Sequence, residues 1–235
     1  MSAADEEPRR GIVRRTREGT GRAKLAEVAR RAGVSTATVS RTFNEPDKVS
    51  QAVREKVREA AHAVNWVPNA AARALASSRT HIAGAIIPTL DNEIFARQIS
   101  GLQQVFSESG YDLLIGCSNY DPEEGLRQAR AMTARGVEAI ALVGETHPPE
   151  LFEIIDDQHI PYVLTYTFHA GATRPLIGFD NREAFRRVTR HLLDLGHRRF
   201  AVVLQPIENN DRATARFDGI VAALGEAGVG LADDD

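Results

Sequence analysis

Two kinds of hydrophobic spacing divide this chain. In the first part, apolar residues recur three and four positions apart, as Leu25, Val28 and Ala29 do, which is the spacing of an amphipathic helix. From His81 onward, short apolar runs alternate with amphipathic stretches, which is typical of a parallel sheet covered by helices on both faces. The pattern therefore predicts a small helical module followed by a doubly wound α/β body.

The helical module has the spacing of a helix-turn-helix. Gly33 follows the first helix and supplies a left-handed backbone position that ends it. Ser35 is a good N-cap for a second helix over residues 36–43, which buries Val39, and Ala29 is small where the two helices cross. This spacing matches a motif whose second helix enters the major groove of DNA, with an ordinary helical hairpin as the alternative on local pattern alone.

A third helix and a hinge are predicted next. Residues 45–49 form a loop, and Ser50 is predicted to cap a helix whose apolar stripe closes the core of the module. That stripe consists of Val53, Val57, Ala60 and Val64. Asn69 then caps a short alanine-rich helix that runs through Ala76. Because so short a helix is marginal in water, the pattern fits either a hinge helix that folds on DNA or a simple flexible linker.

The body alternates strands and helices. Strands are predicted over residues 82–87, 111–116, 137–143, 160–165, 176–179 and 200–204. Helices are predicted over residues 94–109, 122–135, 149–158, 182–195 and 212–227. Ligands of such sheets bind beyond the carboxyl ends of the strands. Those ends are residues 88–95, 117–121, 144–148, 166–168 and 180.

Charge is distributed unevenly along the chain. The formal net charge is -3 at pH 7, yet residues 1–80 hold 16 Lys and Arg against 9 Asp and Glu, whereas the remainder holds 13 against 23. A basic head on an acidic body indicates that the head meets a polyanion. Residues 1–23 have little apolar content and many arginines, so they are predicted to be a disordered basic arm.

Several function classes lack their sequence signals. The single cysteine, Cys117, argues against an internal disulfide framework and suits a reducing cytoplasm. No apolar run approaches the roughly 18 residues of a membrane span, and the N-terminus carries no secretory signal. Glycine-rich phosphate loops, nucleophile elbows and metal-spaced His/Cys clusters are missing from the sequence. We therefore expect no catalytic site, metal, cofactor or membrane partner.

Recognisable motifs extend from Lys24 to about Gly228. The head contains KLAEVARRAGVSTATVSRTFN, the hinge WVPNAAARALASSRT, and the body IPTLDNEIFA, GYDLLI, GFDN and LGHRRFAVV. Together they resemble the lactose-repressor family of bacterial transcription regulators. Within that family, IPTLDNEIFA, GETHPPEL and IGFDN are most similar to gluconate-type repressors. The resemblance implies a periplasmic-binding-protein-like body behind the DNA-binding head.

The resemblance also implies a homodimer that places two heads on a pseudo-palindromic operator. The residues expected to contact DNA are Ser35, Thr36, Ala37, Thr38, Arg41, Asn44, Asn69 and Leu75. Thr36, Ala37 and Arg41 would face base edges, where a bidentate contact from Arg41 to guanine is worth about 1–3 kcal/mol of discrimination. Leu75 matches a wedge that enters the minor groove at the operator centre and kinks it.

An effector cleft between two lobes is the second implication of the resemblance. The residues expected there are Asp91, Asn92, Ile94, Phe95, Glu145, Thr146, His147, Arg212 and Arg216. Arg212 and Arg216 suit an acidic sugar, because arginine pairs bidentately with carboxylates. Glu145 fits an acidic ligand less well and is interpreted as a hydroxyl acceptor. His147 either contacts the ligand or caps the helix that follows it.

The expected domain organisation follows from these matches. It consists of a basic arm (1–23), a head (24–68), a hinge helix and linker (69–80), a first lobe (81–180) and a partial second lobe (181–235). Compared with the family pattern, a stretch on the order of 100 residues, about a domain, is expected to be missing from the second lobe onward. A fragment of a longer protein, a premature stop and a natural short regulator are the three explanations, of which the first two are favoured.

The leading hypothesis is a cytoplasmic, homodimeric DNA-binding regulator of the repressor type that responds to a small sugar or sugar acid, with gluconate as a guess. One alternative is a truncated regulator with impaired dimerisation and effector binding. Two others are a sugar-binding module without DNA function and an enzyme on a flavodoxin-like sheet. The basic head speaks against the sugar-binding module, and the missing catalytic constellation speaks against the enzyme.

Overall fold

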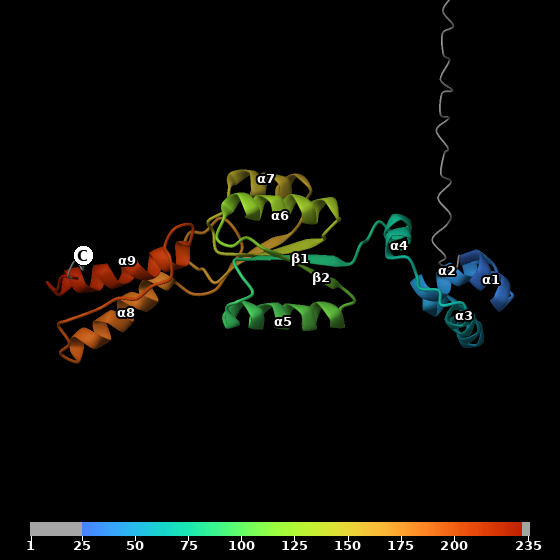
Figure 1. The fold of residues 1–235 in the computed structure, drawn as a ribbon, viewed down its shortest axis with the longest axis horizontal. Helices are drawn as coiled ribbons and strands as arrows, with labels where there is room; N and C mark the ends of the chain where they lie inside the picture. Colours follow the sequence, from blue (N-terminus) through green and yellow to red (C-terminus); the bar gives the residue numbers. More distant parts are fainter. Residues whose placement is uncertain (1–24, 232–235) are drawn as a thin grey trace, which may run out of the picture. The chain divides into compact units, whose positions relative to one another are not determined.

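The computed structural model describes residues 25–231 of the chain (Figure 1). Two compact units divide it: one ends at Arg73 and the other begins at Ala74. The predicted basic arm at residues 1–23 lies outside the described residues.

The first unit is a three-helix head built on the predicted helix-turn-helix. Its elements are α1 (Leu25–Ala32), α2 (Thr36–Asn44), the short 3₁₀ helix η1 (Pro46–Lys48) and α3 (Gln51–Ala63). Val28, Val39 and Val57 are fully buried, one from each α-helix, so the predicted apolar faces meet in one core. Gly33 has φ +67°, which confirms the left-handed turn expected there.

The two predicted helix caps of the head differ in outcome. The Ser35 Oγ accepts a hydrogen bond from the backbone N–H of Thr38 at 3.1 Å, as predicted. Ser50 occupies the N-cap position of α3, as predicted, but its side chain makes no capping hydrogen bond to that helix. Ser50 is exposed, so water can satisfy the first amides of that helix instead.

The alanine-rich segment forms a helix, α4 (Ala70–Ser77). The Asn69 Oδ1 accepts the backbone N–H of Ala71 at 3.0 Å, which confirms the predicted cap. Arg73 is the only charged residue in the two turns of α4. The stability of so short a helix depends on what it packs against.

The body contains a five-stranded sheet in the order β2-β1-β3-β4-β5. The strands are β1 (Ile82–Ile87), β2 (Asp112–Cys117), β3 (Ala139–Val143), β4 (Tyr162–Thr165) and β5 (Leu176–Ile177). All neighbouring pairs are parallel, and Ala83 pairs in register with both Leu113 and Ala139. The predicted doubly wound parallel sheet is therefore confirmed.

Helices cover both faces of this sheet (Figure 1). Helix α5 (Glu93–Glu108) lies on one face, and α6 (Pro122–Ala134) and α7 (Pro149–Asp157) lie on the other. Alternate residues of β1 point to opposite sides: Ala85 and Ile87 pack with α5, whereas Ile86 joins the core under α6 and α7. The apolar β1, with side chains buried on both sides, is typical of a central strand of a parallel sheet that helices cover on both faces.

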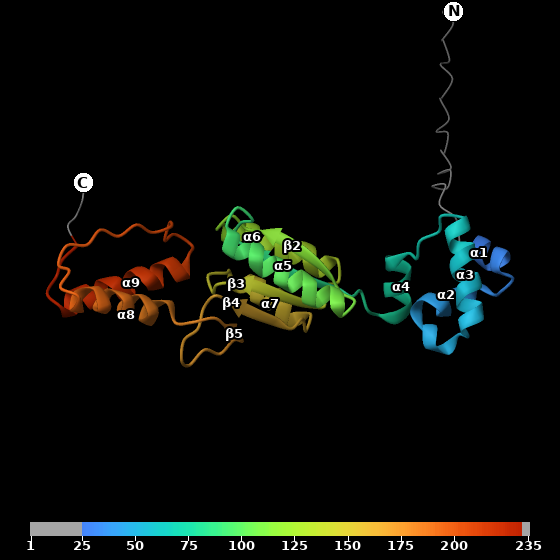
Figure 2. The ribbon, with the colours of Figure 1, turned by 90° about the horizontal axis from the view of Figure 1, so that it is seen from below.

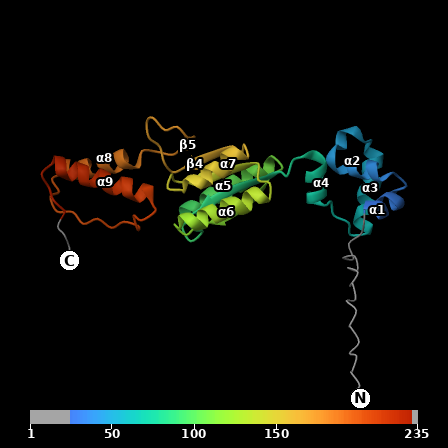
Figure 3. The ribbon, with the colours of Figure 1, turned by 90° about the horizontal axis from the view of Figure 1, so that it is seen from above.

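Beyond the sheet, α8 (Asn181–Asp194) and α9 (Asp211–Glu226) pack side by side in all views (Figure 2, Figure 3). The close approach needs Gly219, because a Cβ there would lie 2.1 Å from the Arg182 carbonyl oxygen. Leu193, Ile220 and Leu224 form their small core.

Two of the predicted strands need correction. Residues 200–204 form no strand, and Val203 is 96% exposed, because no described strand lies beside them to complete the backbone hydrogen bonds. The strand predicted over 176–179 is confined to Leu176–Ile177. It ends where Gly178 approaches the backbone of Thr167 so closely that a Cβ would lie 2.5 Å from the Thr167 nitrogen. Over residues 25–231, no helix is long and apolar enough to cross a membrane.

Candidate nucleic-acid interface and effector cleft

Helix α2 presents an exposed polar face. Thr36, Ala37 and Arg41 are all exposed, and Ala37 and Arg41 are four positions apart, so they lie on the same side of the helix. The opposite side is fixed in the core by Val39 and by the 2% exposed Thr42, whose hydroxyl donates to the Thr38 carbonyl oxygen at 2.9 Å. A rigidly held helix with a free guanidinium-bearing face is suited to reading a base edge.

Polar groups occupy the two ends of α2. Ser35 and Thr38 lie at its N-terminus, with 2.9 Å between their hydroxyl oxygens. Asn44 is the last residue of the helix, and its Nδ2 donates to the Ser40 Oγ at 3.2 Å. Hydroxyls at a helix N-terminus are placed to bind a phosphate together with the free backbone amides.

Leu75 is an unusual residue for the surface of α4. Its side chain is 87% exposed, although leucine is the only large apolar residue in this helix. A large apolar side chain with so little contact within its own unit is available to a partner.

The candidate effector cleft lies at the carboxyl ends of the strands. After β1, Asn92 caps α5 through its Oδ1, which accepts the Ile94 backbone N–H at 3.0 Å, and Asp91 is exposed beside it. The structure separates the next two residues: Ile94 is 59% exposed, whereas Phe95 is 6% exposed. Phe95 packs edge-on against Tyr166, with 5.5 Å between ring centroids, and belongs to the buried core between α5 and the sheet.

Glu145, which follows β3, connects three segments of the cleft. Its backbone N–H donates to the Asp211 Oδ2 at 2.7 Å. Its carboxylate accepts the Thr167 hydroxyl at 3.1 Å and lies 3.2 Å from the His169 Nε2. The hydrogen bond to Glu145 raises the pKa of His169, which favours a charged imidazolium beside the carboxylate.

Arg212 is 6% exposed and its charge is matched within the chain. Its Nη1 lies 2.7 Å from the Asp211 Oδ1. The pair fits under the loop after β3 only because Gly144, at φ +78°, has no side chain: a Cβ would lie 1.8 Å from that Nη1. Asp211 therefore joins the start of α9 to the loop and also neutralises a buried arginine.

Arg216 lies one turn further along α9. Its Nε donates to the Asn181 Oδ1 at 2.8 Å, and the Asn181 Nδ2 donates to the Tyr166 carbonyl oxygen at 2.8 Å. Burial, and then the nearby charge of Arg212, lower the pKa of Arg216. The Arg212 guanidinium is therefore already paired with Asp211. The Arg216 guanidinium is bound to the neutral amide of Asn181 and can bind further acceptors.

His147 lies in a narrow part of the cleft that Thr146, Tyr120, Asn209 and Arg212 also line. Burial lowers its pKa, so the neutral imidazole is favoured. Within residues 25–231 its buried Nε2 has no hydrogen-bond partner. The alternative that His147 caps the next helix is wrong, because the N-cap of α7 is Pro148 and no side chain caps that helix.

Of the expected effector residues, Thr146, His147 and Arg212 line one hollow. Ile94 is joined to Arg216 by hydrogen bonds through Tyr166 and Asn181, and Glu145 is joined to Arg212 through Asp211. Sequence reasoning missed several of the residues that make these links. His169, Asn181 and Asp211 were missed, whereas Tyr166 and Thr167 lay in the predicted strand end 166–168 but were not among the expected effector residues. Tyr166 has φ +65° and donates its hydroxyl to the Ile94 carbonyl oxygen at 3.0 Å. The sequence signal that could have identified these residues is their position after predicted strands or at the starts of predicted helices, where ligands of α/β sheets bind.

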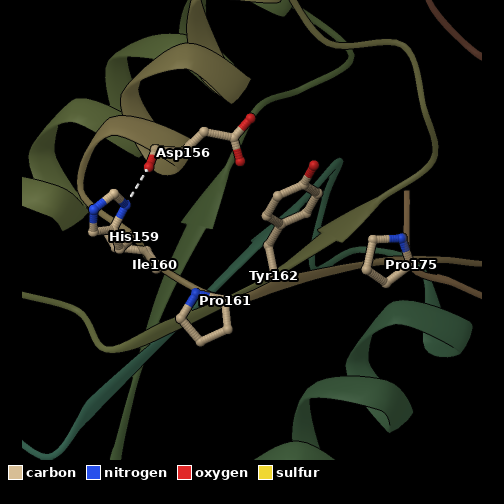
Figure 4. A pocket seen from close by; sticks show the side chains of 6 residues that line it. All are labelled: Asp156, His159, Ile160, Pro161, Tyr162 and Pro175. Atoms are coloured by element: carbon tan, nitrogen blue, oxygen red, sulfur yellow. Dashed lines mark hydrogen bonds between the residues drawn. The ribbon is translucent and has the colours of Figure 1, made fainter. Parts of the chain in front are cut away.

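A second hollow lies at the opposite, amino end of β4 (Figure 4). It is lined by Asp156, His159, Ile160, Pro161, Tyr162 and Pro175. Asp156 and His159 are both exposed, and the His159 Nδ1 lies 2.9 Å from the Asp156 carbonyl oxygen. Over residues 25–231, no group of three His, Cys, Asp or Glu side chains is placed to hold a metal ion. The convergent polar groups therefore lie at the carboxyl end of the sheet.

Comparison with known families and relatives covers both units. Residues 24–69 match the family described as "Bacterial regulatory proteins, lacI family", and residues 80–235 match "Periplasmic binding proteins and sugar binding domain of LacI family". The transcriptional regulator GntR of Pseudomonas aeruginosa is 34% identical over 212 residues, which are 89% of this chain and 60% of that protein. Catabolite control protein A of Staphylococcus aureus is 32% identical over 210 residues, covering 89% and 63%.

Solved structures agree with this match. A transcriptional regulator of the same family from Silicibacter pomeroyi superposes with a TM-score of 0.80 at 30% identity, over 89% of this chain and 63% of that one. The Lac repressor dimer bound to operator and an anti-inducer gives a TM-score of 0.74 at 22% identity, over 89% and 64%, and shows the shared fold. The chain thus spans about three fifths of the length of these relatives.

Proposed function

This chain belongs to the LacI family of bacterial regulatory proteins, and from that membership we propose that it is a sequence-specific DNA-binding regulator of the repressor type, controlled by a small sugar or sugar acid. The observation that carries the proposal is the exposed face of α2 on a helix-turn-helix that matches the family over residues 24–69. The proposed setting is the bacterial cytoplasm, and the proposed role is binding without catalysis.

In the proposed complex, α2 enters the major groove. Arg41 reads a guanine, Thr36 and Ala37 face neighbouring base edges, and Ser35, Thr38 and Asn44 bind phosphates. Two chains form a homodimer on a pseudo-palindromic site. In each chain the proposed parts are the head (24–68), the hinge helix and linker (69–80), the first lobe (81–180) and the partial second lobe (181–235). The capped α4 supports a hinge helix beside Asn69.

The proposed effector binds among the loops at the carboxyl end of the sheet. Glu145 and Arg216 offer an acceptor and a donor for sugar hydroxyls, and the exposed Ile94 offers an apolar surface for a sugar face. Two regulators named GntR are 29% and 34% identical to the chain, so gluconate is the first compound to test. Because Asp211 already neutralises Arg212, neutral sugars belong in the same test.

Effector and DNA binding are coupled through the hinge in this proposal. An effector that binds one arrangement of the lobes better shifts the population of folded hinge helices and thereby changes operator affinity. A short helix near the limit of stability is suited to such an order–disorder transition.

The direct test selects a preferred site from random DNA and titrates the full chain against it at two salt concentrations, with and without gluconate and neutral sugars. A symmetric site bound by two chains, a steep salt dependence and an effect of one sugar support the proposal. Weak, monomeric binding that ignores sequence would contradict it for this chain and favour the truncated-regulator alternative.

Leu75→Ala is expected to weaken binding to a site whose two half-sites are correctly spaced. Without the wedge, the central base step is not held open, so the contacts that depend on the kink are lost. Affinity for the symmetric site should fall about ten-fold or more, since bending and unstacking involve a few kcal/mol. Val67→Ala is the matched control, because Val67 is also an exposed apolar residue, at 79% exposure, but lies before α4. Equal losses in both variants would exclude a wedge role.

A further inference from the structure

The segment between α4 and β1 is short and conformationally unusual. Within residues 78–81, Ser78 and His81 both have φ +55°, a backbone conformation that residues other than glycine rarely adopt. Such backbone angles persist where surrounding contacts hold them. Several of those contacts end on one residue of the first lobe, Glu138.

The Glu138 carboxylate binds this segment through both oxygens. Its Oε1 accepts the backbone N–H of Thr80 at 2.6 Å and that of His81 at 3.1 Å. Its Oε2 accepts the Arg79 Nε at 2.9 Å and the Tyr111 hydroxyl at 2.8 Å. Arg79 and Tyr111 also contact each other, so backbone and side chains of the segment converge on one carboxylate.

Glu138 is itself held firmly. Its backbone N–H donates to the Ile82 carbonyl oxygen at 2.8 Å, beside the paired starts of β1 and β3. Beside it, the Thr80 hydroxyl donates to the Gly136 carbonyl oxygen at 2.5 Å. Burial opposes ionisation of Glu138, but the donors Tyr111, His81, Arg79 and Thr80 outweigh it and lower its pKa to about 2. The carboxylate is therefore charged over the whole physiological range.

We propose that Glu138 is a positioning residue that fixes residues 78–81, the linker between α4 and β1, to the first lobe. Because the linker is fixed, movement of the lobe is transmitted to the hinge helix. The consequence for DNA binding rests on the proposed function. A linker free to rotate at Ser78 and His81 would absorb movement of the lobe, whereas one held at two backbone amides transmits it. The residue acts through the linker and touches neither DNA nor effector.

The first test measures hydrogen exchange of individual backbone amides in the full chain. In Glu138→Gln, protection of the Thr80 and His81 amides should fall about ten-fold or more, because hydrogen bonds to a charged acceptor are replaced by weaker ones. Glu153→Gln, an exposed carboxylate on α7, is the matched control. Tyr111→Phe removes a single donor and should give a smaller loss. Equal protection of these amides in Glu138→Gln and Glu153→Gln overturns the proposal.

The second test compares operators whose half-site spacing is correct or one base pair longer. Wild type should discriminate strongly between them, and Glu138→Gln should bring the affinity ratio toward one while affinity for a single half-site is unchanged. If Glu138→Gln loses amide protection but keeps the wild-type ratio of affinities for the two spacings, Glu138 does not position the hinge. If wild type binds no specific DNA, the proposed function fails, and hydrogen exchange alone decides whether Glu138 fixes the linker.

Discussion

Asp211→Ala is expected to lower the free energy of unfolding of the α/β body by roughly 3–5 kcal/mol, the usual cost of leaving a buried charge without its partner. Arg212 has a side chain only 7% exposed, and its Nη1 lies 2.7 Å from Asp211. The same aspartate accepts the Glu145 backbone N–H at 2.7 Å, so its removal also frees the start of α9 from the loop after β3. Equilibrium urea unfolding followed by circular dichroism measures the loss.

A matched variant separates the buried pair from the general effect of removing an acidic residue. Asp218→Ala lies on the same helix at an exposed position and should change stability by less than about 0.5 kcal/mol. Combining Asp211→Ala with Arg212→Met, which removes the unpaired charge, should recover a large part of the stability. Similar unfolding curves for Asp211→Ala and Asp218→Ala would show that the pair is not important for the fold.

Arg41→Ala is expected to cost about 1–3 kcal/mol of discrimination at each half-site, about 5- to 150-fold in affinity. Arg41 is exposed on α2, four positions from Ala37, where a bidentate contact to guanine is geometrically accessible. The loss should be confined to the preferred sequence, because non-specific binding depends on phosphate neutralisation. Competition titrations of specific against random DNA measure the ratio.

Arg58→Ala provides the control for charge. Arg58 is exposed on α3 of the same head, so its removal changes the net charge equally without touching α2. Any weakening in this variant should be uniform across sequences and accompanied by a shallower salt dependence if Arg58 meets a phosphate. A uniform loss in Arg41→Ala as well, with base preference retained, would contradict base reading by Arg41.

Features set by local physical chemistry were predictable from the sequence alone. The helices of the head follow from apolar spacing, Gly33 from the need for a left-handed residue, and the caps at Ser35 and Asn69 from short side-chain acceptors before a helix. The order of strands and helices in the body followed from the alternation of buried and amphipathic segments. In each case the residues that determine the structure lie within a few positions of one another.

The tertiary structure decided what depends on distant partners. A strand at residues 200–204 fits the local pattern, but a strand needs a neighbour for its backbone hydrogen bonds, and none is present over residues 25–231. The Asp211–Arg212 pair packs under Gly144 and binds the backbone of Glu145, and the donors of the linker bind Glu138. Each of these contacts joins segments about 60 residues apart in the sequence. The sequence by itself thus determined most of the helices and strands and the family of this protein. Only the folded chain decided which charges are already paired, because that depends on which loops the sheet brings together.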